Sequence, residues 1–102
     1  MTHYVAIVEE EEGKAVGVWF PDLPGCVSAG DTLDEAMTNA AEALQLWAEA
    51  MIENGRKIPP ARSLTELKAD PEVGEDLRRF MVALIAFPAD LQHAAEWPLA
   101  RA

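Results

Sequence analysis

The sequence has 102 residues, half of them hydrophobic, and a formal net charge of −10 at pH 7. This length suits one domain with a single core, and the apolar content excludes a disordered chain. It contains no run of about 20 apolar residues for a membrane span and no signal-peptide pattern, so we expect a soluble, cytoplasmic protein.

Acidic residues are concentrated in the first half of the chain. Residues 1–54 hold eleven Asp or Glu and one basic residue, Lys14, whereas residues 55–102 hold seven acidic and seven basic residues. An acidic surface repels phosphate backbones and attracts basic partners. The charge map therefore disfavours direct nucleic-acid binding by the first half. It leaves two interpretations open, a surface for a basic partner and a merely solvated face.

Three short strands are predicted in the first thirty residues. Tyr4–Val8 and Ala15–Phe20 are rich in β-branched and aromatic residues, and the polar stretch "EEEEGK" between them is typical of a hairpin loop. A third run, Cys26–Ala29, is closed by Gly30. The intervening "PDLPG" holds two prolines and a turn glycine, which indicates a fixed connection between the second and third strands.

A long helix follows the third strand. Thr32 and Glu35 have the spacing of a capping box, and Asn54-Gly55 supplies a stop signal. Between them, apolar residues recur at steps of three and four and predict one apolar stripe on a helix of about six turns. The stripe consists of Leu33, Met37, Ala40, Leu44, Trp47 and Met51.

The second half predicts a short helix and one more strand. Ser63 and Glu66 repeat the capping-box spacing, and we expect Pro71 to end this helix. Phe80–Phe87 is the most apolar run of the chain and predicts a buried strand that Pro88 ends. Three strands, a long helix, a short helix and a returning strand indicate an α+β sandwich of two layers, with the long helix over one face of the sheet.

The sequence shows no assembled active site. His3 and His93 lie near opposite ends of the chain, and one cysteine with two histidines does not make a zinc site. Cys26 has no His, Lys or Arg between Lys14 and Arg56, so we expect a buried, inert thiol whose pKa the surrounding acids raise. The run "EEEE" lacks EF-hand spacing and is typical of a solvated loop. We therefore predict no catalytic residue, no metal and no cofactor.

The stretch "GKAVGVWFPDLPGCVSAGDTLDEAMTNAAEALQLWAEAMIENGRKIPP" resembles the HicB family of antitoxins. The resemblance covers roughly residues 4–66. It rests on an ordered set: an aromatic-rich strand that runs into "FPDLPGC", a "GDT" opening, a helix rich in Glu and Ala, and a glycine followed by a proline pair. Each piece alone is weak, whereas the ordered set is specific.

The resemblance implies a partial ribonuclease-H-like fold over residues 1–88, with the order β-β-β-α-α-β. It also implies a partner, the HicA toxin, a small basic ribonuclease that cleaves messenger RNA with a histidine and that the antitoxin inhibits by covering this histidine. Family members commonly continue into a DNA-binding domain. The tail, residues 89–102, has no room for one, so we do not expect DNA binding by this chain.

The resemblance and the charge map together give the candidate partner-binding residues. These are Trp19, Pro21, Asp22, Leu23, Pro24, Gly25 and Asp31, with Trp19 and Leu23 as apolar anchors. Apolar residues beyond the needs of one sheet face, among them Leu46, Met51 and Ile52, predict a homo-oligomer, a dimer or tetramer. Two other functions stay open: an orphan structural or oligomerisation domain without a toxin, and a metal-dependent nuclease on the ribonuclease-H-like frame.

Overall fold

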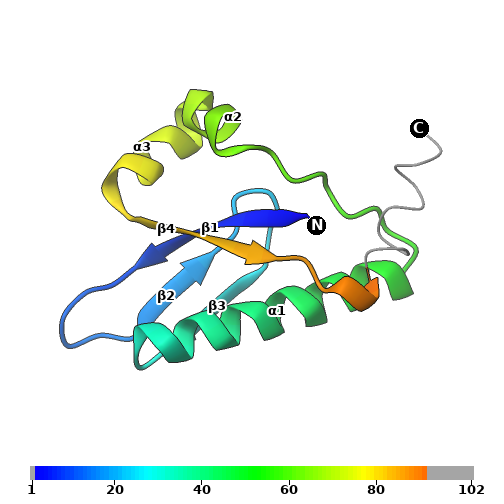
Figure 1. The fold of residues 1–102 in the computed structure, drawn as a ribbon, viewed down its shortest axis with the longest axis horizontal. Coiled ribbons are helices and arrows are strands. Elements are labelled where there is room, and N and C mark those ends of the chain that lie inside the picture. Colours follow the sequence, from blue (N-terminus) through cyan, green and yellow to red (C-terminus); the bar gives the residue numbers. More distant parts are fainter. Residues whose placement is uncertain (1, 92–102) are drawn as a thin grey trace.

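The structure is a computed structural model, and it describes residues 2–91. Within this part of the chain the strands form one antiparallel sheet in the order β3-β2-β1-β4, shown in Figure 1. The strands are β1 His3–Glu9, β2 Val16–Trp19, β3 Val27–Gly30 and β4 Met81–Ala86. The helices are α1 Leu33–Glu53, α2 Leu64–Ala69 and α3 Pro71–Arg79, and a 3₁₀ turn spans Ala89–Leu91. The predicted α+β class and the order of its elements are confirmed, with one helix more than expected.

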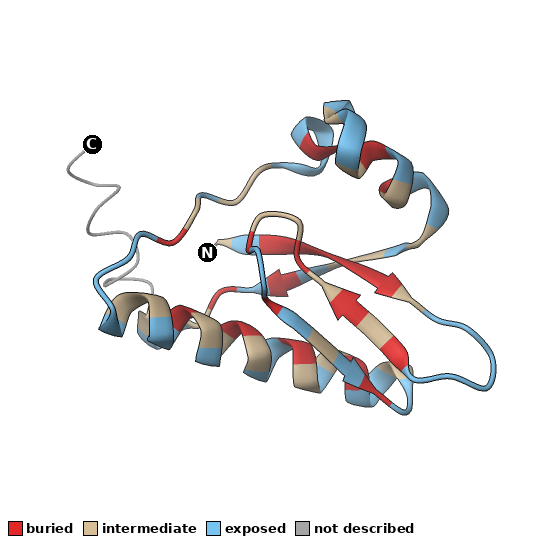
Figure 2. Ribbon diagram, turned by 180° about the vertical axis from the view of Figure 1, so that it is seen from behind, coloured by how far each residue is buried: buried red, intermediate tan, exposed pale blue. Residues whose placement is uncertain are grey.

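Helix α1 covers one face of the sheet. Figure 2 shows its buried residues on the side turned toward the strands. The sheet contributes side chains that alternate along each strand, namely Tyr4, Ala6, Val8, Val16, Val18 and Ile85. The helix contributes a fully buried line at a spacing of four, namely Ala36, Ala40, Leu44 and Ala48. The expected stripe is confirmed, but most of its large residues flank this line of mainly small ones.

The start of α1 lies very close to β3. The hydroxyl of Thr32 accepts a hydrogen bond from the Glu35 backbone N–H, while the Glu35 carboxylate accepts one from the N–H of Asp31 rather than from Thr32. At Gly30, an added Cβ would lie 2.5 Å from the backbone nitrogen of Ala36, well inside van der Waals contact. Glycine is therefore required where the third strand turns into the helix.

Helices α2 and α3 cover part of the other face, so the expected two-layer sandwich is wrong. Leu67 and Leu77 from these helices pack against Val5 and Ile7 of β1. Helix α2 ends at Ala69, just before Pro71 as expected, and Pro71 then opens α3, with Asp70 as N-cap accepting from the Glu72 N–H at 2.9 Å. Proline is tolerated at the first helical position because its missing N–H has no intrahelical partner there.

Strand β4 lies at an edge of the sheet. It pairs only with β1, from His3↔Ala86 to Val8↔Met81. The apolar run that predicted a buried strand is therefore largely exposed: Leu84 is 62% and Met81 44% exposed, and within the strand only Ile85 is buried. An apolar run predicts a strand, but it does not predict whether the strand lies at the edge or in the centre of the sheet, because that depends on the order in which the strands pair.

The predicted "PDLPG" connection is a tight turn built on the core. The N–H of Leu23 donates to the Phe20 carbonyl and the N–H of Cys26 to the Leu23 carbonyl, at 3.1 and 2.9 Å. Leu23 itself is fully buried. Gly25 has φ +86°, which confirms the positive backbone angle that its place in the turn predicts.

Asp22 connects this turn to the segment between α1 and α2. Its two carboxylate oxygens accept hydrogen bonds from the backbone N–H and from the Nε of Arg62, both at 2.7 Å. The Nη1 of Arg62 donates to Asp70 at 2.9 Å, and together with the Glu72 N–H this holds the pKa of Asp70 below its usual value. The Tyr4 hydroxyl fixes the same segment by donating to the Pro59 carbonyl at 2.6 Å. Burial first, and Asp22 second, raise the pKa of Tyr4 to about 12.

None of the helices in the described part of the chain combines the length and the apolar character that a membrane crossing requires.

We predict that Gly25→Val lowers the free energy of unfolding by about 1–3 kcal/mol, because valine resists a positive φ. Gly17→Val is the matched control, since Gly17 has no positive φ and both glycines have open space where a Cβ would lie. Urea unfolding of the two variants measures the difference. Equal stability of both would contradict a strained conformation at residue 25.

We predict that Asp22→Asn lowers the free energy of unfolding by about 1–2 kcal/mol, because it removes a charge-assisted acceptor whose side chain is only 7% exposed. Glu11→Gln is the control. It removes the acidic partner of an exposed ion pair, in which Glu11 and Lys14 lie 3.3 Å apart, and we expect almost no change. An Asp22 variant as stable as the Glu11 variant would exclude a structural role for the Asp22–Arg62 contact.

Candidate partner-binding surface

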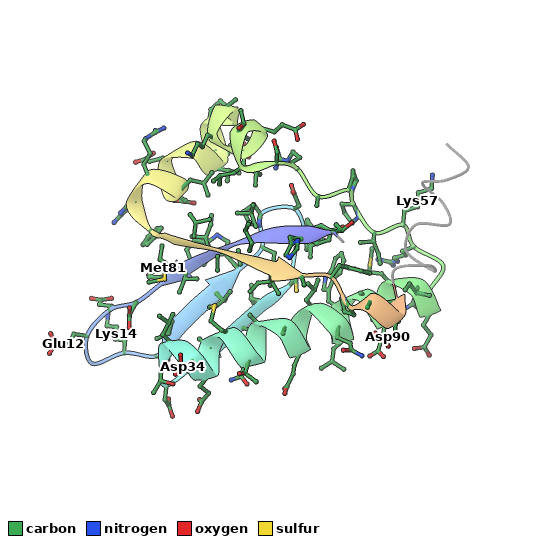
Figure 3. All side chains as sticks on the ribbon, in the orientation of Figure 1. Glu12, Lys14, Asp34, Lys57, Met81 and Asp90 are labelled. Carbon is green, nitrogen blue, oxygen red and sulfur yellow. The ribbon has the colours of Figure 1, made fainter. Side chains whose placement is uncertain are left out.

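One end of the sheet is strongly acidic. The pairing of Val16 with Gly30 brings the β1–β2 hairpin loop beside the start of α1. Figure 3 shows Glu12, Lys14 and Asp34 at this end of the molecule. We call this region the acidic end; it comprises Glu9, Glu10, Glu11, Glu12, Asp31, Asp34 and Glu35, all of them exposed except Glu9, which is half-buried. Seven carboxylates in one region create a negative potential that attracts cationic partners.

A shallow hollow lies next to the acidic end, over β2 and β3. Its floor consists of Gly17, Trp19 and Val27, and its rim includes Glu9, Glu11 and Lys14. The floor lies on the face of the sheet opposite α1, where α2 and α3 do not extend over β3. Val27 is accordingly 63% exposed. The hollow thus offers apolar contact area beside an acidic rim, a combination typical of protein-binding surfaces.

The strand register explains why this floor is apolar. Val82, Ile7, Trp19 and Val27 lie opposite one another across the four strands and form a single row. The row is covered at its β4–β1 end by Leu67 and Leu77 and open at its β3 end. Trp19 stands at the boundary. Its ring meets Phe80 edge-on, with centroids 5.5 Å apart, and the packing holds the indole in place.

The structure divides the predicted site residues between two ends of the sheet. Asp31 lies at the acidic end, whereas the turn residues 21–25 lie at the opposite end of β2 and β3, and Trp19, which pairs with Val27 next to the turn, lies in the hollow between the two. Leu23, the expected apolar anchor for a partner, has no exposed surface in this fold. Asp22 is bonded to Arg62, and the Pro24 carbonyl accepts from the Trp47 indole N–H at 3.2 Å.

The turn therefore supports the fold through the contacts of Asp22 and Pro24, the burial of Leu23 and the positive φ of Gly25. A direct contact of residues 21–25 with a partner stays a prediction. The hollow itself contains residues that the sequence pattern does not single out, such as Gly17 and Val27. The alternation of small and apolar residues along β2 and β3 places them on one face, but only the position of α2 and α3 leaves that face open.

Cys26 is buried, and its burial raises the pKa of the thiol to about 11. The predicted burial of Cys26 is confirmed. The expected cause was wrong, because burial rather than neighbouring acids accounts for the shift. Over residues 2–91, no three His, Cys, Asp or Glu side chains lie close enough together to hold a metal ion. His93 lies outside the described residues.

The chain matches known proteins over most of its length. Residues 4–95 match the family model described as the HicB-like antitoxin of bacterial toxin-antitoxin systems. An uncharacterized 14.9 kDa protein from the rep-hol intergenic region of Haemophilus phage HP1 is 37% identical over 93 residues. That match covers 91% of this chain and 64% of the phage protein, so the chain spans somewhat less than two thirds of this relative.

Two solved structures have a similar fold. The N-terminal domain of the Burkholderia pseudomallei antitoxin HicB superimposes with a TM-score of 0.69 at 31% identity, over 85% of this chain and 99% of that domain. A chain in a HicA3 and HicB3 toxin-antitoxin complex gives a TM-score of 0.66 at 24% identity, over 83% of this chain and 96% of that chain, a likeness of fold. From the match over residues 4–95, the chain belongs to the HicB-like antitoxin family.

Proposed function

We propose that this chain is a non-enzymatic binding module that neutralises a small, basic, mRNA-cleaving toxin of the HicA type by covering its active site. The observation that carries the proposal is the open apolar hollow of Trp19 and Val27 beside the acidic end. A ribonuclease that binds RNA presents a basic surface, and this region has the opposite charge. A toxin-antitoxin complex that contains a chain of the same fold supports the choice of partner.

The two parts of the surface have different tasks in this proposal. The acidic end draws the basic partner in and orients it, which acts mainly on the rate of association. The hollow supplies desolvated apolar contact, and Trp19, held by Phe80, is the anchor with the largest apolar area. Occlusion follows because a toxin surface seated over the hollow is no longer accessible to RNA. We also propose the cytoplasm, where messenger RNA is translated, as the site of action.

Other functions have less support. A metal-dependent nuclease would need converging carboxylates around Mg²⁺, and the described residues contain no such cluster. An orphan structural or oligomerisation domain would leave the acidic end without a partner. The product of the adjacent gene distinguishes the orphan domain from the proposed antitoxin. For an antitoxin we expect this product to be a small basic protein that co-purifies with the chain. We also expect that it arrests growth and cleaves RNA when expressed alone, and that co-expression of this chain suppresses both effects.

We predict that association with the cognate toxin slows steeply with added salt, because electrostatic steering is screened over about 8 Å at physiological ionic strength. The double variant Glu9→Gln/Glu11→Gln should slow association and flatten its salt dependence. Glu72→Gln/Glu75→Gln, which removes the same charge from α3, is the control and should change association far less. Stopped-flow mixing at several salt concentrations measures both. Equal effects of the two double variants would place the toxin elsewhere than on the acidic end.

A further inference from the structure

Gly17 is a glycine that the fold itself does not require. It lies in β2, which pairs with β1 on one side and with β3 on the other. Of the six glycines in the chain, three have a positive φ, and at Gly30 and Gly74 an added Cβ would lie 2.5 and 2.6 Å from a backbone atom. Gly17 has neither a positive φ nor any atom within 4 Å of an added Cβ. A glycine inside a central strand weakens the strand and often marks a place where a ligand or another chain approaches closely.

The strand register shows what surrounds the open position at Gly17. Gly17 pairs with Glu9 on β1 and with Ala29 on β3, so these residues form one row across the sheet. Trp19 lies two positions further along β2 and therefore on the same face, because side chains alternate along a strand. Glu9, Gly17 and Trp19 accordingly line the same hollow. The space above Gly17 is thus bordered by a carboxylate on the neighbouring strand and by an indole on its own strand.

We infer that the space above Gly17 receives an arginine side chain of the partner. The aliphatic part of this arginine lies on the backbone of Gly17, and its guanidinium lies between the Trp19 indole and the Glu9 carboxylate. A guanidinium is planar and weakly hydrated, so it can contact an aromatic ring and pair with a carboxylate at the same time. The inference rests on the proposed function, because it names the side chain with which a basic toxin enters the hollow.

The charges around the hollow suit a cation, although Lys14 lies at its rim. The ammonium of Lys14 is 3.3 Å from the Glu11 carboxylate, so this pair is close to neutral as a whole. Glu9 is half-buried and forms no ion pair within residues 2–91. Its carboxylate therefore remains available to a cation of the partner. An apolar or anionic group seated here would remove water from this carboxylate without replacing it, which disfavours both kinds of group.

The full chain alone tests the preference for arginine. The probe is Nα-acetyl-arginine amide, and Nα-acetyl-citrulline amide, which has nearly the same shape but no charge, is the control. In NMR titrations of the isotope-labelled chain, we expect a saturable shift of the Gly17 and Trp19 amide resonances with the arginine probe and about tenfold weaker binding of the citrulline probe. Glu9→Gln should remove this preference. Equal shifts with both probes, or no saturable shift with either, would overturn the inference.

Gly17→Val tests the space itself, because it replaces a hydrogen by an isopropyl group where the arginine would lie. Ala41→Leu is the matched control, since it adds the same group at an exposed position of α1, which covers the other face of the sheet. We expect Gly17→Val to abolish the arginine-induced shifts and Ala41→Leu to leave them unchanged. Gly17→Val should also unfold at no lower urea concentration than the unaltered chain, because valine favours a strand. Unchanged arginine binding by folded Gly17→Val would overturn the inference.

The same two variants separate this inference from the proposed function. With the product of the adjacent gene as the partner, we expect Gly17→Val to weaken binding by about tenfold or more and Ala41→Leu to leave it unchanged, with dissociation constants measured by calorimetry. If Gly17→Val binds as tightly as the unaltered chain, the inference is overturned and the proposed function stands. If the gene product binds none of these chains, the proposed function fails, and the arginine titration alone decides the inference.

Discussion

The contact between Asp22 and Arg62 fixes the relation between the two halves of this fold. The chain leaves α1 in a ten-residue segment, Asn54–Ser63, without regular structure and must cross to the other face of the sheet. Asp22 binds both the backbone and the side chain of Arg62 at 2.7 Å, and Arg62 reaches on to Asp70, the residue that caps α3. A turn in the first half thereby sets where α2 and α3 begin, because their N-terminal caps lie next to the fixed segment.

This placement determines which surface stays open. Helices α2 and α3 cover the row of Val82 and Ile7 but stop at Trp19, so Val27 at the β3 end of the row remains exposed, and the hollow extends from there along β2 to the hairpin loop. Seven of the eleven acidic residues of the first half form the acidic end beside the hollow. An apolar floor and a negative rim therefore arise together from the sheet register and the position of α3, and they give a member of the HicB-like antitoxin family a surface suited to a basic partner.

Local signals in the sequence predict most of the fold. Thr32 and Ser63 cap their helices as expected, Gly25 adopts the positive φ that its turn requires, and the three early strands pair as a meander. Helix α3 is missed because a proline such as Pro71 is a stop signal for the helix before it, although Asp70-Pro71 is also a start signal for a new one. The exposure of β4 and the burial of Leu23 depend on which elements become neighbours, which no local pattern contains. For the same reason the site residues, close in sequence, separate to two ends of the sheet.

In the proposed complex the toxin docks on the hollow and the acidic end, away from β4. Hydrogen exchange of this chain, alone and bound to its cognate toxin, tests it directly because it reports on every backbone amide in the assembled state. We expect slower exchange on binding in residues 9–19 and 27–35, with β4 unchanged. Slower exchange confined to α2 and α3, or to residues 81–86, would contradict it.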